Sequence, residues 1–216
     1  MQRYAVIIGD IVQSRRLKNR TKVQEIFLKT IEKIKKEFSQ MFISPPTITI
    51  GDEFQAVLKR TDNLFVMIHR FESYISPIVL RFGIGVGVIE TPINTREAIG
   101  MDGSAFHNAR FAIEEARTSG IRYNLHTDSA DGSTRALELL LRWVDMNRRS
   151  WKGKNLEVLT LHRMGKNQIE IAKTLDISQP AVSQHINKYD FSLVVESEVC
   201  IEERLNQYLI GNSGEY

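Results

Sequence analysis

An aspartate follows a glycine directly in two stretches, Ile8-Gly9-Asp10-Ile11-Val12 and Ile50-Gly51-Asp52-Glu53-Phe54. Each follows an apolar, β-branched run that is typical of a β-strand. If the two strands are neighbours, Asp10 and Asp52 project from one end of a sheet at one point. Two hard oxygen ligands at one point suit Mg²⁺ or Mn²⁺ carrying a nucleoside triphosphate. The alternative is that Gly-Asp simply marks two turns.

Length and composition narrow the class of protein. The 216 residues suffice for one large domain or two small ones. No apolar run is long enough to span a bilayer and the N-terminus lacks a secretion signal, so we expect a cytoplasmic protein with no membrane partner. Cys200 is the only cysteine, which excludes intrachain disulfides and cysteine-built metal sites.

The net charge of +3 is small, but its distribution is uneven. From Arg142 to Lys166 there are seven Lys/Arg residues against two acidic ones, whereas the segment after Asp190 carries five Glu against Arg204. The basic stretch indicates an anionic partner, although solvated helix faces give a similar local count.

The order of the expected elements predicts an α+β fold. Patterns of period two and 3.6 predict strands at residues 4–12, 47–50, 53–58, 79–90 and 122–127, and helices at residues 22–38, 64–75, 103–117 and 134–147. Ser44-Pro45-Pro46 is expected to interrupt regular secondary structure just before the second strand. The order βαββαβ, followed by αβ, predicts a mixed sheet with helices packed on it. The glycines at positions 83, 85 and 87 share one face of a strand, which must let another backbone or helix come very close.

Four motifs in this order resemble the palm-like catalytic domain of class III adenylate/guanylate cyclases and GGDEF diguanylate cyclases, over roughly residues 4–127. The run Gly9–Val12 resembles the strand whose aspartate and following carbonyl hold the metals, which implies Asp10 and Ile11 as ligands. The second Gly-Asp run lies where cyclases have their second metal aspartate, here Asp52. Residues 81–87 are similar to the glycine-rich strand beneath the cyclase nucleotide, and residues 103–110 resemble the helix start whose Asn and Arg act on the triphosphate.

The catalytic helix departs from the cyclase pattern. Aligned on Ala109, the cyclase Asn position is held by His107, while Asn108 and Arg110 each lie one residue from the expected place. One residue on a helix is a rotation of about 100°, enough to aim a side chain elsewhere. Ile50 also replaces the first glycine of the GGDEF pattern, which removes a close approach to guanine. His107, Asn108 and Arg110 are therefore catalytic candidates, and whether the chain is an enzyme stays open.

A physical argument for a nucleotide stands beside the resemblance. Asp10 and Asp52 can neutralise one or two divalent ions that bridge phosphates, whereas Glu53 points to the opposite face from Asp52 if its strand is regular. Backbone amides just past the first strand can hold phosphates while the following arginines add charge; the alternative for this basic run is an exposed loop. The predicted nucleotide contacts are Gln13, Ser14, Arg15, Arg16, Gly51, Gly83 and Gly85.

Residues 155–188 resemble a helix-turn-helix whose second helix enters the major groove of DNA. Asp176-Ile177-Ser178 predicts the tight turn, with Ser178 as the N-cap of the second helix. The alternative is a helical hairpin that serves only dimerisation. We predict base contacts by Gln179, Ser183 and Gln184, and phosphate contacts by Arg163, Lys166 and Lys188.

The whole chain looks most like the SatD family, which joins such a domain to a C-terminal DNA-binding element. The predicted fold is therefore α+β, a ferredoxin-like or palm-type sheet with packed helices, followed by a small all-α helix-turn-helix domain. The predicted units are a cyclase-like domain at residues 1–130, a connecting helix at 131–152, the helix-turn-helix at 153–190, and a C-terminal helix and tail at 191–216.

Three functional hypotheses follow. The first is a homodimeric, DNA-binding transcription regulator whose cyclase-like domain binds a metal–nucleoside triphosphate or related nucleotide as a signal. The second is an active nucleotidyl cyclase or nucleotidyltransferase that uses the two metal-binding aspartates. The third is a pseudoenzyme scaffold that keeps only the fold. An enzyme needs a cationic group close to the α- or γ-phosphate, and a sensor does not.

Overall fold

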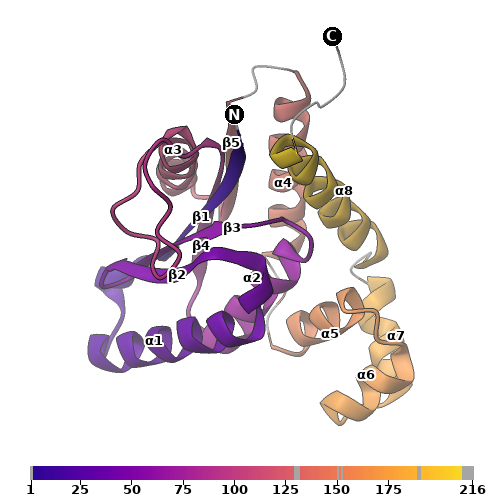
Figure 1. The fold of residues 1–216 in the computed structure, drawn as a ribbon. Helices are drawn as coiled ribbons and strands as arrows, with labels where there is room; N and C mark the ends of the chain where they lie inside the picture. The colour runs from indigo at the N-terminus through magenta and orange to yellow at the C-terminus, as the bar shows by residue number, and fades with distance from the viewer. Residues whose placement is uncertain (1, 129–131, 150, 152, 189–190, 211–216) are drawn as a thin grey trace.

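The computed structural model describes residues 2–128, 132–149, 151, 153–188 and 191–210 (Figure 1). Its centre is one mixed sheet with the strand order β2-β3-β1-β4-β5. The pairs β2–β3, β1–β3 and β1–β4 are antiparallel, and β4–β5 is parallel. The strands are β1 (Arg3–Ile11), β2 (Phe42–Ile50), β3 (Glu53–Leu58), β4 (Leu80–Val88) and β5 (Tyr123–Thr127).

The helices follow in the order that the sequence predicts, so the α+β class is confirmed. They are η1 (Ser14–Arg16), α1 (Arg20–Glu37), η2 (Ser39–Met41), α2 (Leu64–Ile75), α3 (Ser104–Ser119), α4 (Gly132–Arg148), α5 (Lys154–Arg163), α6 (Gln168–Leu175), α7 (Gln179–Lys188) and α8 (Phe191–Ile210).

The prediction that Ser44-Pro45-Pro46 interrupts regular secondary structure is wrong, because these residues lie inside β2. β2 is an edge strand, where proline's missing N–H need not break a ladder hydrogen bond. Its pairing with β3 also shifts register between Ser44 and Thr47, so the prolines fall in an irregular part of the strand.

Helices cover both faces of the sheet. On one face α1 and α2 enclose an aromatic core, in which Phe54 stacks on Phe71 with 4.7 Å between the ring centroids. On the other face α3 lies directly on β4. A Cβ atom built on Gly85 would lie 2.1 Å from the Ala109 backbone nitrogen, and one on Gly83 would lie 2.5 Å from that of Ile113. The predicted close approach of a helix to the glycine face is confirmed.

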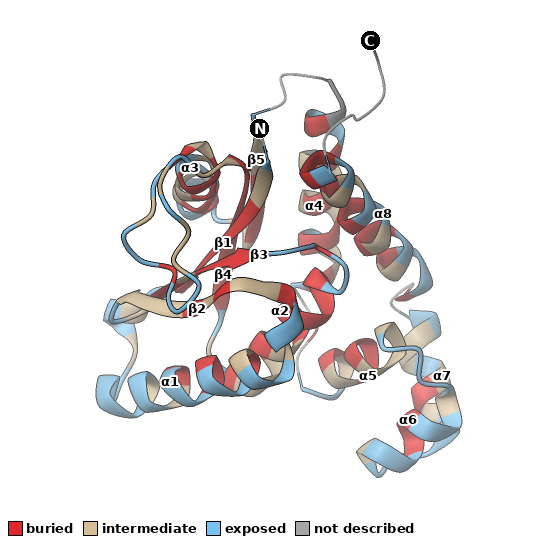
Figure 2. Cartoon of the chain, in the orientation of Figure 1, coloured by how far each residue is buried: buried red, intermediate tan, exposed pale blue. Residues whose placement is uncertain are grey.

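The C-terminal half adds two parts to this sheet unit (β1–β5 with α1–α3). The long helices α4 and α8 lie side by side (Figure 1). Helix α4 contacts β5, whereas α8 contacts β1, β4 and α2. Beyond α4, the short helices α5, α6 and α7 pack on one another as a helical unit, with α5 against α2. The outward sides of α6 and α7 are largely exposed (Figure 2).

The predicted domain limits fall largely on residues that lie outside the described part of the chain. These are residues 129–131, 150, 152 and 189–190, and the tail from 211 to 216. The limits therefore stay predictions. Among the described residues, no helix combines the length and apolarity needed to cross a membrane.

Candidate functional site

Two buried carboxylates meet at one end of the sheet, on the face that α3 covers. Asp10 of β1 stands opposite Glu53 of β3 on one side and opposite Arg81 of β4 on the other. Because directly opposed residues in an antiparallel pair point to the same face, the three side chains lie together. Asp10 and Glu53 are each only 5% exposed. The structure thus brings Asp10 together with Glu53, the residue that the sequence ranks below Asp52.

Arginines neutralise both carboxylates. Arg110 makes a bidentate contact with Glu53, at 2.7 and 2.8 Å. Arg117 donates to Asp10 at 2.8 Å, and Arg81 reaches both oxygens of Asp10 at 3.1–3.2 Å. Arg110 and Arg117 are seven residues apart on α3, which places them two turns apart on one helix face. We call these five residues the carboxylate cluster.

The protonation states within the carboxylate cluster follow from these contacts. Burial alone would raise the pKa of Glu53, but hydrogen bonds from Arg110 and Thr49 and the charges of Arg110 and Arg117 lower it below its ordinary value. The hydrogen bond to Glu53 raises the pKa of Arg110, and the one to Asp10 raises that of Arg117. Glu53 is therefore ionised at neutral pH, and the α3 arginines stay cationic.

Asp52 occupies the turn between β2 and β3, next to the end of β1. The Ile11 amide donates to the Asp52 carbonyl at 3.1 Å, which ties this turn to β1. The Asp52 carboxylate has no hydrogen bond or ion pair with another described residue. It is half-buried, so it is available to a ligand arriving from solvent.

Whether a divalent metal fits depends on the two arginines that contact Asp10, Arg81 and Arg117. Asp10, Asp52 and the Ile11 carbonyl are the hard oxygen donors that Mg²⁺ and Mn²⁺ prefer. However, both Asp10 oxygens are engaged by guanidinium groups, and within the described ranges no three His, Cys, Asp or Glu side chains form a group that could hold a metal. The donor set fits a metal only if both guanidinium groups give up Asp10: that of Arg117, whose side chain is 46% exposed, and that of the buried Arg81.

The segment after β1 leaves several backbone donors free. Gln13 has a left-handed conformation (φ 54°, ψ 35°), and the 3₁₀ turn η1 follows it. The amide N–H groups of Gln13, Ser14 and Arg15 have no hydrogen-bond acceptor among the described residues. A left-handed residue followed by a helical turn forms a concave row of N–H groups of the kind that binds anions. Arg15 and Arg16 beside it are exposed. The geometry of this segment is compatible with the predicted phosphate contacts, which stay a prediction.

Of the three catalytic candidates, only Arg110 reaches the carboxylate cluster. His107 is largely exposed and contacts Asp102 at 3.0 Å. Asn108 donates to the Val86 carbonyl and to Asp128, at 2.8 and 2.7 Å. These contacts lie near the C-terminal end of β4, whereas Asp10 pairs with Arg81 near its N-terminal end. His107 and Asn108 are therefore placed away from both predicted metal aspartates.

The remaining predicted nucleotide contacts differ in accessibility. The glycine face of Gly83 and Gly85 is filled by the α3 backbone, so a nucleotide could touch it only if α3 moved. Gly51 lies in the open β2–β3 turn beside Asp52. The sequence motifs do not single out Arg81 or Arg117 as site residues. The period of two that aligns Gly83 with Gly85 also places Arg81 on their face, and this signal could have found it.

The second candidate site is the α6–turn–α7 segment. Asn167 caps α6 in a capping box with Glu170, and Asp176 adopts the left-handed conformation (φ 51°) that closes the helix. The Ala181 amide donates to the Ser178 side chain at 3.3 Å, which caps α7 as predicted. Val182 is buried. Gln179, Gln184, Lys166 and Lys188 are exposed and Ser183 is half-buried.

Arg163 does not join these exposed residues. The sequence places it among the phosphate contacts, but its side chain is only 10% exposed and pairs with Glu202 and Glu198 of α8. Two acidic residues on the neighbouring helix therefore hold the guanidinium inward. Arg163 links α5 to α8 in this structure, and its guanidinium group is not exposed for contact with DNA.

Comparisons with known proteins identify a family, and they also find two distantly similar solved structures. A sequence model of the SatD family matches residues 4–195. A solved bacterial light-regulated adenylyl cyclase is 13% identical with a TM-score of 0.42, over 56% of this chain and 74% of its own. A regulator of polyketide synthase expression from Bifidobacterium adolescentis is 14% identical with a TM-score of 0.28, over 94% and 86%. A search of curated proteins gives no match.

Proposed function

We propose that this chain, which belongs to the SatD family, is a homodimeric, DNA-binding transcription regulator whose sheet unit binds a metal–nucleoside triphosphate or related nucleotide as its signal. The observation that carries the proposal is the α6–turn–α7 segment. Both helices begin at capping residues, a left-handed Asp176 joins them tightly, and α7 turns Gln179, Gln184 and Lys188 outward.

The chemistry of α7 suits duplex DNA. Glutamine amides can pair with the base edges of the major groove, and lysines with phosphates. Gln179 already donates to Gln168 at 2.7 Å, so its amide is held near the start of α7. In helix-turn-helix proteins the first residues of the second helix contact the bases.

The turn between β1 and α1 supports a nucleotide as the signal. The free amides of Gln13, Ser14 and Arg15 and the exposed Arg15 and Arg16 offer donors and charge for phosphates. The unpaired Asp52 carboxylate lies beside the end of the same strand and supplies an oxygen ligand for the accompanying Mg²⁺ or Mn²⁺.

The arginines on α3 favour a sensor over a cyclase. A nucleotidyl cyclase needs a cationic group aimed at the triphosphate. Of the candidates His107, Asn108 and Arg110, only Arg110 lies at the carboxylate cluster. Its two terminal guanidinium nitrogens both donate to the carboxylate of Glu53. It holds the sheet to α3 instead of pointing to the turn that follows β1.

The DNA proposal predicts a loss of sequence discrimination on changing α7. Replacing Gln184 by Ala should reduce the preference for a selected site over random duplex by about 1–3 kcal/mol, the value of one good base contact. Replacing Lys166 by Ala should instead weaken binding to all sequences alike and reduce the salt slope by about one. Selection from a random duplex library at low salt, followed by competition binding, measures both. A dimer should select half-sites about one helical turn apart.

The matched control is Gln207→Ala on α8, an exposed glutamine outside the helical unit that should leave binding unchanged. If the protein retains no duplex even at low salt, residues 153–188 are an interaction hairpin and the regulator proposal fails. If Gln184→Ala and Gln207→Ala select the same site with the same strength, α7 does not read bases.

The nucleotide proposal predicts binding that depends on the metal. Replacing Asp10 and Asp52 together by Asn should weaken binding of a nucleoside triphosphate in Mn²⁺ by at least about tenfold, because a bridging ion contributes several kcal/mol. Titration calorimetry with the four triphosphates measures this. Asp62→Asn, an exposed aspartate whose contact with Arg60 is 3.9 Å, is the control. Equal binding in excess chelator would contradict the role of the two carboxylates.

A further inference from the structure

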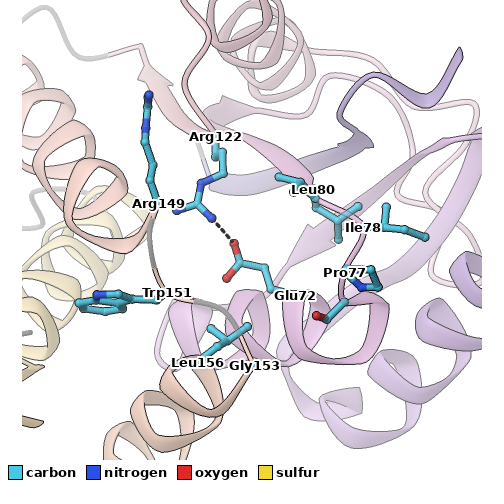
Figure 3. A pocket seen from close by; sticks show the side chains of 11 residues that line it. Glu72, Pro77, Ile78, Leu80, Arg122, Arg149, Trp151, Gly153 and Leu156 are labelled. Carbon is cyan, nitrogen blue, oxygen red and sulfur yellow. Dashed lines mark hydrogen bonds and ion pairs between the residues drawn. The ribbon is translucent and has the colours of Figure 1, made fainter. Parts of the chain in front are cut away.

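A cavity of about 270 Å³ lies where the sheet unit meets the segment that leads into the helical unit. Ile78 and Leu80, at the start of β4, form one wall, and Trp151 and Leu156 form the facing wall (Figure 3). These walls are apolar, and each belongs to a different part of the chain. Leu80 lies on the opposite face of β4 from its neighbour Arg81, so this cavity is separate from the carboxylate cluster.

Two arginines with spare hydrogen-bonding capacity line the charged end of the cavity. Arg122 makes one strong bond, from Nε to Asp145 at 2.7 Å. Its Nη1 and Nη2 make only long contacts, 3.5 Å to Glu72 and 3.4 Å to the Asp145 carbonyl. Arg149 reaches Asp145 at 3.0 Å, but its Nη1 has no hydrogen bond to another described residue. Its side chain is 49% exposed. Both guanidinium groups can therefore donate to a further acceptor.

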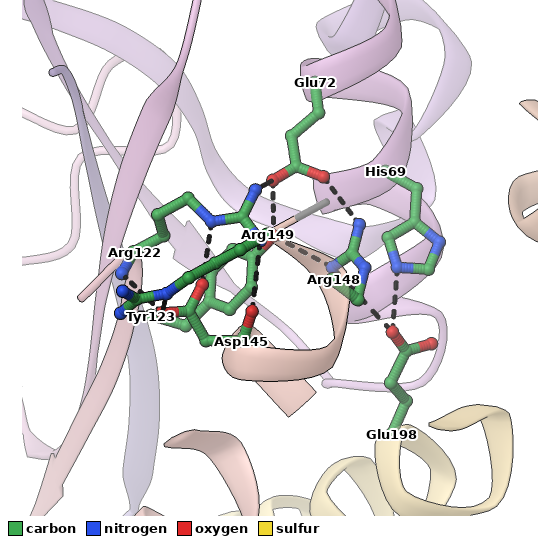
Figure 4. A network of polar contacts seen from close by, with 8 residues as sticks. All are labelled: His69, Glu72, Arg122, Tyr123, Asp145, Arg148, Arg149 and Glu198. Atoms are coloured by element: carbon green, nitrogen blue, oxygen red, sulfur yellow. Dashed lines mark hydrogen bonds and ion pairs between the residues drawn. The ribbon is translucent and has the colours of Figure 1, made fainter. Parts of the chain in front are cut away.

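The charges behind the cavity leave a surplus of arginine. The buried Arg148 pairs with Glu72 at 2.6 Å, and Arg122 and Arg149 share the single carboxylate of Asp145 (Figure 4). Three guanidinium groups thus face the two carboxylates of Glu72 and Asp145. Buried charges in proteins are normally paired.

Glu198 does not supply the missing negative charge. It lies 3.9 Å from Arg148, but burial raises its pKa to about 8, so it is mostly protonated at neutral pH. Its other partners are Arg163 at 3.6 Å and His69 at 2.8 Å, and burial lowers the pKa of that histidine well below its ordinary value. The His69–Glu198 pair is thus close to neutral and leaves the arginine surplus uncompensated.

We propose that the cavity binds a small organic carboxylate with an apolar body, its anionic group held by Arg122 and Arg149 and its body packed between Ile78 and Trp151. The volume lies just below the usual range for ligand pockets, so the occupant is smaller than a nucleoside triphosphate. Because the two walls come from the sheet unit and from the segment before α5, the occupant stabilises the arrangement in which these parts are docked. The site is independent of the proposed nucleotide site.

The test uses the full chain and a pair of probes that differ only in charge. Phenylacetate should bind saturably in titration calorimetry and raise the melting temperature, whereas the neutral phenylacetamide should bind at least about tenfold more weakly. Arg149→Gln should weaken phenylacetate binding by about tenfold or more. Arg135→Gln, an exposed arginine near the start of α4 and away from the cavity, should leave it unchanged.

A second variant tests the apolar walls without touching a charge. Ile78→Trp, at a half-buried position, should fill the cavity and abolish binding while the protein stays folded. The proposal is overturned if phenylacetate, benzoate and hexanoate all fail to bind saturably. It is equally overturned if phenylacetamide binds as well as phenylacetate, or if neither Arg149→Gln nor Ile78→Trp changes the affinity.

Discussion

Replacing Arg148 by Met should lower the free energy of unfolding by about 3–5 kcal/mol, the cost of leaving a buried charge without its partner. Arg148 is 1% exposed and donates to Glu72 at 2.6 Å and to the Tyr123 hydroxyl at 2.9 Å. Burial alone would raise the pKa of Glu72, and the charge of Arg148 is the main influence that lowers it. Without that arginine, Glu72 would retain, among the described residues, the 3.5 Å ion pair with Arg122 and the hydrogen bond from the Tyr123 hydroxyl.

Urea denaturation of the full chain measures this cost, and Arg135→Met is the matched control. Arg135 lies on the same helix, but its side chain is 61% exposed and its one ion pair within the described part of the chain is with Glu138, one turn away. Its loss should therefore change stability by no more than about 0.5 kcal/mol. Similar effects of the two variants would mean that water or another cation reaches Glu72, and that the contacts linking α2, α4 and β5 contribute little.

The network around Arg148 also shows why the charge distribution misleads as a functional signal. The sequence indicates an anionic partner for the basic stretch from residue 142 to 166. In the structure Arg163 of that stretch pairs with Glu198 and Glu202 from the acidic segment that follows. Arg149 pairs with Asp145 inside the stretch itself. Part of the basic charge is thus already paired within the chain, and the contacts of Arg163 with α8 are tertiary pairs that no local count reveals.

The fold itself is predictable because its signals are local. The apolar stripe of α2 predicts its observed limits, Leu64 and Ile75. Phe71, which belongs to this stripe, is buried in the core. The prolines of β2 are the exception, because their tolerance depends on β2 being an edge strand, which is a property of the whole sheet.

The candidate site is less predictable because its partners come from distant segments. Asp10 can be recognised from its Gly-Asp context, but its contact Arg117 follows 107 residues later. The sequence favours Asp52 as its companion, whereas strand register puts Glu53 opposite Asp10. A one-residue difference in a turn changes the face to which a side chain points. The sequence motifs locate this end of the sheet. Only the pairing of β1 with β3 and the packing of α3 on the sheet show which charged side chains meet there.

Replacing Gly85 by Ala should cost about 3 kcal/mol or more, at the upper end of the penalty for overpacking. The new methyl group would lie 2.1 Å from the Ala109 nitrogen and 2.3 Å from the Ala105 oxygen. Both atoms belong to the α3 backbone, so relief requires the whole helix to move away from β4. Gly51→Ala is the matched control, since its Cβ would have only an ordinary 3.8 Å contact with Gln24.

The same displacement should reach the carboxylate cluster, because α3 carries both Arg110 and Arg117. Moving α3 off the sheet draws these guanidinium groups away from Glu53 and Asp10, which leaves two buried carboxylates less well paired. Chemical denaturation of Gly85→Ala and Gly51→Ala measures the stability term. If Gly85→Ala is as stable as the parent chain, α3 can shift without loss. The glycine strand would then not be what fixes the arginines over Asp10 and Glu53.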